Sequence, residues 1–192
     1  MTQPESTTSW RPRIGRTGLL ALGTGVRIVL APVVMALVLN GNDTAATIVF
    51  LVAAATDWFD GRLARRWEVT TRFGSFLDTT ADKLLVSCAL IALLAVDRVS
   101  PWVVALIVSR ELILLGLRAA VAAEGLHIET SILGKWKATV QFVAIALAMI
   151  RPDVTIAGAY LDEWAMVIAT VVTLWSGYDY LVRYLHALRT PR

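Results

Sequence analysis

Long uninterrupted runs of apolar residues dominate the pattern along this chain. Six of them are separated by short polar or Gly- and Pro-marked breaks, and about 20 apolar residues are enough for a helix to cross the hydrocarbon layer of a membrane. Because the runs are continuous rather than alternating, they predict helices that satisfy their own backbone hydrogen bonds. The six predicted spans cover approximately residues 20–40, 44–64, 75–96, 101–122, 135–150 and 157–183.

Composition supports a membrane protein. Of the 192 residues, 57% are hydrophobic and 17% are charged, which is too apolar for an ordinary soluble domain. We therefore expect an all-α integral membrane protein with a six-transmembrane-helix bundle in residues 20–185. A cytoplasmic or interfacial segment precedes it in residues 1–19, and a cytoplasmic tail follows in residues 186–192. The single cysteine, Cys88, provides neither a disulfide framework nor a cysteine-based metal site.

The basic residues are distributed unevenly between the two sides of the predicted bundle. They gather in both terminal segments and in the two loops near residues 62–75 and 123–135, whereas only Arg98 and Arg151 lie on the opposite side. By the positive-inside rule, both termini and these two loops face the cytoplasm, and the plasma membrane is the expected location. The basic residues line the membrane face without a soluble domain to present them, so no nucleic-acid role is indicated.

Four carboxylates gather where the second and third predicted spans approach their cytoplasmic ends. Asp57 and Asp60 are three residues apart, and Asp78 and Asp82 are four apart, so each pair occupies one face of its helix. A loop of about ten residues allows the two pairs to meet. A lone aspartate at a helix end is usually a solvated interfacial charge, but four in this spacing predict a site.

Four neighbouring carboxylates repel one another unless cations neutralise them. All-oxygen ligands suit Mg²⁺ or Mn²⁺, and the two histidines lie far along the chain. Two such cations bridged by carboxylates commonly stabilise a phosphoryl group during displacement. Gly61 and Gly74 leave room for a ligand or another helix to approach closely, and Arg65 supplies a bidentate hydrogen-bond donor for phosphate. An ion carrier also uses intramembrane carboxylates, but its site is expected near the midplane between repeated halves, and this chain has no repeat.

The fixed positions of this region match a known pattern. The sequence Asp57-x2-Asp60-Gly61-x2-Ala64-Arg65-x8-Gly74-x3-Asp78-x3-Asp82 resembles the signature of the CDP-alcohol phosphatidyltransferases. The resemblance implies a six-helix homodimer that transfers a phosphatidyl group from CDP-diacylglycerol and releases CMP. It also implies two divalent cations, one held by Asp57, Asp60 and Asp78, and the other by Asp57, Asp78 and Asp82.

The same resemblance assigns the donor side of the site. Gly61, Arg65 and Thr71 contact the cytidine diphosphate group, and Ala64, Gly74 and Thr24 complete the expected CDP-lipid site. The family often has Asn-x2-Thr-x2-Arg in the first span; Thr24 and Arg27 fit this pattern, whereas Ala21 replaces the asparagine. We expect Asp82, one turn from Asp78, to act as the general base that accepts the proton of the acceptor hydroxyl.

The acceptor side depends on basic residues in the fourth and fifth spans. The segments SRELILLGLR and GKWKATVQ resemble family members that use sn-glycerol 3-phosphate. Its phosphate requires a second positive pocket, for which the available cations are Arg110, Arg118, Lys135 and Lys137. Alternatively, Arg110 pairs with a bundle carboxylate such as Asp179, and the lysines meet anionic headgroups of membrane lipids. Three functional alternatives also remain: a sibling enzyme that uses inositol phosphate, one that uses phosphatidylglycerol, and a divalent-cation carrier.

Overall fold

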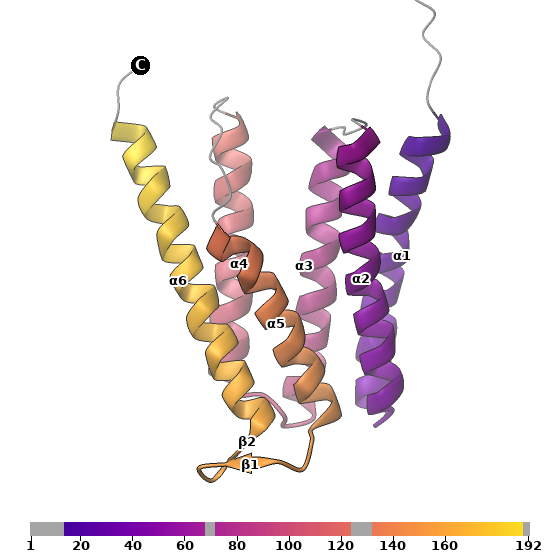
Figure 1. Cartoon of the computed structure of the whole chain (residues 1–192), viewed down its shortest axis with the longest axis vertical. Coiled ribbons are helices and arrows are strands. Elements are labelled where there is room, and N and C mark those ends of the chain that lie inside the picture. The colour runs from indigo at the N-terminus through magenta and orange to yellow at the C-terminus, as the bar shows by residue number, and fades with distance from the viewer. Residues whose placement is uncertain (1–13, 68–71, 124–131, 190–192) are drawn as a thin grey trace, which may run out of the picture.

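Six helices and one short β-hairpin form the computed structural model of this chain (Figure 1). It describes the backbone of residues 14–67, 72–123 and 132–189, and the side chains of residues 23–56, 74, 76–121 and 136–186. The all-α class predicted from the apolar runs is confirmed. The elements are α1 (Ile14–Leu39), α2 (Asp43–Trp67), α3 (Arg72–Ala95), α4 (Pro101–Ala123), α5 (Ile132–Ile150), β1 (Thr155–Ile156), β2 (Ala159–Tyr160) and α6 (Leu161–Arg189).

The helices pack as two groups that share one core. Helix α1 packs mainly against α3 and α2, helix α5 packs mainly against α6 and α2, and α4 lies against α6 and α3. Helix α1 begins and α6 ends at the same end of the bundle, and the hairpin lies at the other end (Figure 1). We refer to these as the terminal end and the hairpin end.

Tight turns at the hairpin end reverse the chain between neighbouring helices. Gly41 has a φ of 72°, its amide donates to the carbonyl of Val38, and the amide of Asn42 donates to the carbonyl of Leu37. This left-handed residue after a helix satisfies carbonyls that would otherwise have no partner. Asp97 has a φ of 55° and closes α3 in the same way.

The β-hairpin occupies residues where the sequence predicted the start of the sixth span. Strands β1 and β2 pair antiparallel, and the turn between them contains Ala157 and Gly158 with positive φ. The indole of Trp164 donates a hydrogen bond of 2.9 Å to the carbonyl of Ile156. The hairpin is thereby tied to the first turn of α6, which begins at Leu161 rather than near residue 157.

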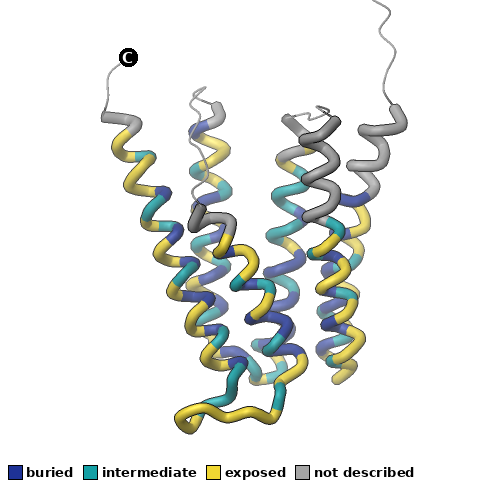
Figure 2. Tube along the Cα trace, viewed as in Figure 1, coloured by how far each residue is buried: buried dark blue, intermediate teal, exposed yellow. Residues whose placement is uncertain are grey.

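Buried and exposed residues alternate along each helix (Figure 2), and large apolar residues occur in both classes. The interior contains side chains from all six helices, and Phe50 packs against Phe142 with ring centroids 5.5 Å apart. On the outside, Val29, Ile113 and Trp175 are each more than 60% exposed, an arrangement that favours lipid rather than water as the surroundings. Within the described residues, one helix, Leu161–His186, is long and apolar enough to span a membrane, and three shorter apolar segments accompany it.

Candidate active site

Helix α3 presents two carboxylates one turn apart, and α1 supplies partners for the first. The guanidinium Nη2 of Arg27 lies 2.6 Å from Oδ1 of Asp78, and the hydroxyl of Thr24 donates to the same oxygen at 3.3 Å. Thr24 and Arg27 are three residues apart, so they project from one face of α1. The two residues that matched the family pattern in the first span thus meet the carboxylate signature on α3.

Much of the predicted CDP-lipid site lies outside the described side chains. Helix α2 carries Asp57, Asp60, Gly61, Ala64 and Arg65 in its helical backbone, but their side chains are outside the described residues. The same holds for the side chain of Lys135 on α5, and Thr71 is outside the described residues altogether. Gly74 lies exposed in the first turn of α3. The predicted roles of these residues therefore stay predictions.

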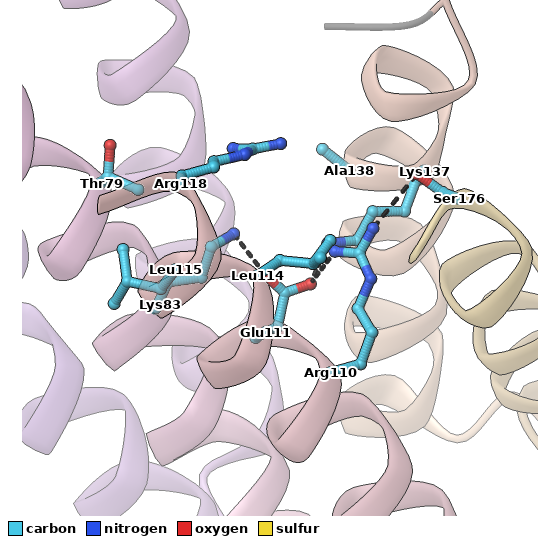
Figure 3. A pocket seen from close by; sticks show the side chains of 10 residues that line it. All are labelled: Thr79, Lys83, Arg110, Glu111, Leu114, Leu115, Arg118, Lys137, Ala138 and Ser176. Atoms are coloured by element: carbon cyan, nitrogen blue, oxygen red, sulfur yellow. Dashed lines mark hydrogen bonds and ion pairs between the residues drawn. The ribbon is translucent and has the colours of Figure 1, made fainter. Parts of the chain in front are cut away.

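A second group of charges surrounds Glu111 on α4, whose side chain is only 4% exposed (Figure 3). Its Oε2 lies 2.6 Å from Nζ of Lys83 on α3, and its Oε1 lies 3.1 Å from Nη1 of Arg110. Oε1 also accepts a hydrogen bond from Nζ of Lys137 on α5. One carboxylate therefore holds three cations that come from three helices.

This group lines a pocket (Figure 3), and most of the lining residues lie between the middle of their helices and the terminal end. Helices α3, α4, α5 and α6 all contribute to its walls. Leu114, Leu115 and Ala138 make part of the lining apolar, whereas most of the remainder is charged. The polar and charged lining residues are Thr79, Lys83, Arg110, Glu111, Arg118, Lys137 and Ser176.

Two residues of α6 contact the two arginines of α4. The Nη2 of Arg110 donates to the hydroxyl of Ser176 at 3.1 Å, and its Nε is buried without a hydrogen-bond partner among the described residues. The guanidinium carbon of Arg118 lies 5.3 Å from the ring centroid of Tyr180, a distance at which a cation is attracted to an aromatic face. Both predicted arginines thus reach one pocket.

The pocket lining carries an excess of positive charge. Among the lining residues whose side chains the structure describes, four are cationic, Lys83, Arg110, Arg118 and Lys137, and one is a carboxylate, Glu111, which leaves three positive charges in excess. Asp82 stands at the edge of this group, because its Oδ2 lies 3.1 Å from Nζ of Lys83. A pocket of this charge, with arginine and lysine donors, suits a phosphate dianion.

Arg110 pairs with a carboxylate of the bundle, as one alternative from the sequence proposed, but the partner is the adjacent Glu111. Asp179, named there as an example, pairs with Arg183 one turn away on α6. The structure also adds two residues to the site. No role was predicted for Lys83 or Ser176. The position of Lys83 directly after the catalytic candidate Asp82 was the available signal; Ser176 had none.

Comparison with known proteins agrees with the geometry. The sequence profile of the family described as CDP-alcohol phosphatidyltransferase matches residues 21–175. Proteins from Escherichia coli (strain K12) and Shigella flexneri serotype 5b (strain 8401), both called CDP-diacylglycerol--glycerol-3-phosphate 3-phosphatidyltransferase, are 40% identical to this chain over 164 residues. The matched region covers 81% of this chain and 88% of each relative. The chain belongs to the CDP-alcohol phosphatidyltransferase family.

Proposed function

We propose that the chain transfers the phosphatidyl group of CDP-diacylglycerol to sn-glycerol 3-phosphate, with phosphatidylglycerol phosphate and CMP as products. The observation that carries this proposal is the cationic pocket beside Asp82, because a phosphorylated acceptor needs a second anion site next to the reacting group. The names of the relatives from E. coli and S. flexneri support the same donor and acceptor.

In the proposed reaction, the acceptor hydroxyl attacks the lipid-linked β-phosphorus of CDP-diacylglycerol. Asp82 accepts the hydroxyl proton as the new oxygen–phosphorus bond forms. The bond between this phosphorus and the bridging pyrophosphate oxygen breaks, and its electron pair leaves with CMP. Arg110, Arg118, Lys135 and Lys137 bind the acceptor phosphate and so orient the hydroxyl toward the donor.

The donor side of the proposal assigns roles to residues of α1, α2, α3 and the loop between α2 and α3. Carboxylate oxygens and the lack of a neighbouring histidine or cysteine fit Mg²⁺ or Mn²⁺, which we propose are held by Asp57, Asp60, Asp78 and Asp82. Two such ions, when bound there, would neutralise the charge of the pyrophosphate. Arg65 donates hydrogen bonds to a phosphate of the donor. A glycine has no side chain, so the donor can approach the backbone most closely at Gly61 and Gly74. The proposed CDP-lipid site consists of Thr24, Gly61, Ala64, Arg65, Thr71 and Gly74.

We further propose the membrane arrangement. The six helices span the plasma membrane as one domain of residues 20–185, with both termini and the active site facing the cytoplasm, and two copies form a homodimer. Clustering of basic residues in the terminal segments and in the two loops on the same side supports this orientation. Most residues that line the pocket lie between the middle of their helices and the terminal end, which agrees with access from the cytoplasm.

The proposal is tested by turnover of the purified protein in detergent or vesicles. We expect CMP release from CDP-diacylglycerol with glycerol 3-phosphate and Mg²⁺ or Mn²⁺, and loss of this release when the divalent cations are chelated. Turnover with inositol phosphate or phosphatidylglycerol in place of glycerol 3-phosphate would identify a sibling enzyme. A protein that releases no CMP with any acceptor but carries divalent cations across vesicles would contradict the enzymatic proposal.

A further inference from the structure

Among the described residues that line the pocket, Glu111 is the one carboxylate, and four others carry cationic side chains. It is 3% exposed, and it contacts Lys83, Arg110 and Lys137 at the same time (Figure 3). These partners come from α3, α4 and α5, so the carboxylate joins three helices at one point. Sequence and family resemblance assigned no role to it.

Three cations that face one another repel, and the repulsion is strong where water is scarce. A carboxylate between them offsets the repulsion and restricts each cation to the positions that its oxygens allow. Lys83 and Lys137 have long flexible side chains, so holding them in one conformation costs more conformational entropy than holding a rigid group. Their contacts with Glu111 offset this cost, and the convergence of the two ammonium groups in the pocket therefore depends on Glu111.

Lys83 extends this group toward the reacting centre. Its Nζ lies 2.6 Å from Oε2 of Glu111 and 3.1 Å from Oδ2 of Asp82. The contact to Glu111 keeps the ammonium group between the proposed base and the acceptor pocket. A phosphate bound by these cations is consequently held at a set distance from Asp82.

We propose that Glu111 is a positioning residue for the acceptor phosphate: it holds Lys83, Arg110 and Lys137 in the arrangement that binds the phosphate, without binding the phosphate itself. This inference rests on the proposed function, because it takes a phosphorylated alcohol as the acceptor. It extends the acceptor site to Lys83, so that the pocket retains three excess positive charges for a dianion. Glu111 also neutralises part of the cation charge before the acceptor arrives.

The test compares Glu111→Gln with Glu111→Asp. Glutamine has nearly the same shape but lacks the charge, so the three cations lose their common partner. We expect the KM for glycerol 3-phosphate to rise by about tenfold or more. Displaced cations would lose charge-assisted hydrogen bonds to the phosphate, and such a loss weakens binding by about this factor. Glu111→Asp keeps the charge on a shorter side chain, and we expect a smaller rise in this KM. The KM for CDP-diacylglycerol should stay within about twofold in both variants, since none of the residues proposed for its site lies on α4 or, among the described side chains, forms an ion pair with Glu111.

The direction in which the KM for glycerol 3-phosphate changes distinguishes a positioning role of Glu111 from a purely electrostatic one. Removing a negative charge makes the pocket more positive, which by itself would lower the KM for an anionic acceptor. A lower or unchanged KM for glycerol 3-phosphate in Glu111→Gln would overturn the inference, even if its melting temperature fell. Glu163→Gln is the matched control, because Glu163 is exposed in the first turn of α6 at the hairpin end; we expect it to behave as wild type.

Three further outcomes also decide between the inference and its alternatives. If Glu111→Gln does not fold, Glu111→Asp decides alone, and a wild-type KM for glycerol 3-phosphate in that variant would overturn the inference. A wild-type protein that is inactive with every phosphorylated acceptor would overturn the proposed function and this inference together. An active wild type with unaffected Glu111 variants would overturn the inference only.

Discussion

The guanidinium of Arg27 lies 2.6 Å from the carboxylate of Asp78, across the contact between α1 and α3. Only 1% of the arginine side chain is exposed, compared with 40% of the aspartate side chain. The guanidinium of Arg27 is therefore fixed inside the bundle, whereas the carboxylate of Asp78 is partly exposed on the side of the candidate site. This geometry gives Arg27 a role in orienting a carboxylate that we assign to metal binding.

Replacement of Arg27 by glutamine is expected to impair both stability and turnover. A hydrogen bond between charged groups contributes about 1.5 to 3 kcal/mol, so we expect a clear fall in the melting temperature in detergent. We also expect slower CMP release, because Asp78 is no longer oriented by its cation. Arg98→Gln is the control: Arg98 pairs with Asp43 at the same distance of 2.6 Å at the hairpin end. It should lower the melting temperature but leave the rate of CMP release unchanged, and an equal loss of CMP release in the two variants would contradict the assignment.

Asp82→Asn is expected to abolish turnover while leaving binding of the CDP-lipid measurable. A positioned general base contributes about 10²- to 10⁴-fold to rate, and the amide cannot accept the proton. CMP release and binding of CDP-diacylglycerol should be measured on the same purified preparation. Asp153→Asn, an exposed change beyond α5 at the hairpin end, should retain full activity. Near-normal turnover of Asp82→Asn would remove Asp82 from the proposed mechanism.

The helices could be predicted from the sequence because a long continuous apolar run can adopt few structures other than a helix in a membrane. Residues 101–122 were predicted as one span, and the structure has α4 at Pro101–Ala123. The hairpin at residues 155–160 was not predicted. Its strands are two residues long, and so short a segment carries no periodicity that distinguishes it from the start of a helix.

The carboxylate signature was visible in the sequence because its spacing follows the turn of a helix. The partners of these carboxylates were not visible, since they come from other helices. Glu111 meets Lys83 and Lys137, which are 28 and 26 residues away, and Arg27 meets Asp78 at a separation of 51. Such contacts depend on how the helices rotate and cross, and a single sequence does not determine this.

Gly177 on α6 gives Arg110 the space that it needs. A methyl group added at this glycine would lie 3.1 Å from Nε and 3.2 Å from Cγ of Arg110. We expect Gly177→Ala to displace the guanidinium and raise the KM for glycerol 3-phosphate several-fold, because overpacking forces a neighbour to move at a cost of about 1 to 3 kcal/mol. Gly116→Ala on α4 is the matched control, since its added methyl group meets nothing within 4 Å. Equal KM values for the two variants would argue against a role for the Arg110 position in acceptor binding.

Tyr180 is expected to contribute to acceptor binding through Arg118. Tyr180 is 8% exposed, and the guanidinium carbon of Arg118 lies 5.3 Å from its ring centroid. An interaction of this kind contributes about 0.5 to 1 kcal/mol, so Tyr180→Leu should raise the KM for glycerol 3-phosphate by about two- to fivefold. Tyr180→Phe keeps the aromatic face and should keep the wild-type KM. If phenylalanine had the same effect as leucine, the hydroxyl rather than the ring face would be the important group, and Arg118 would need another explanation for its position.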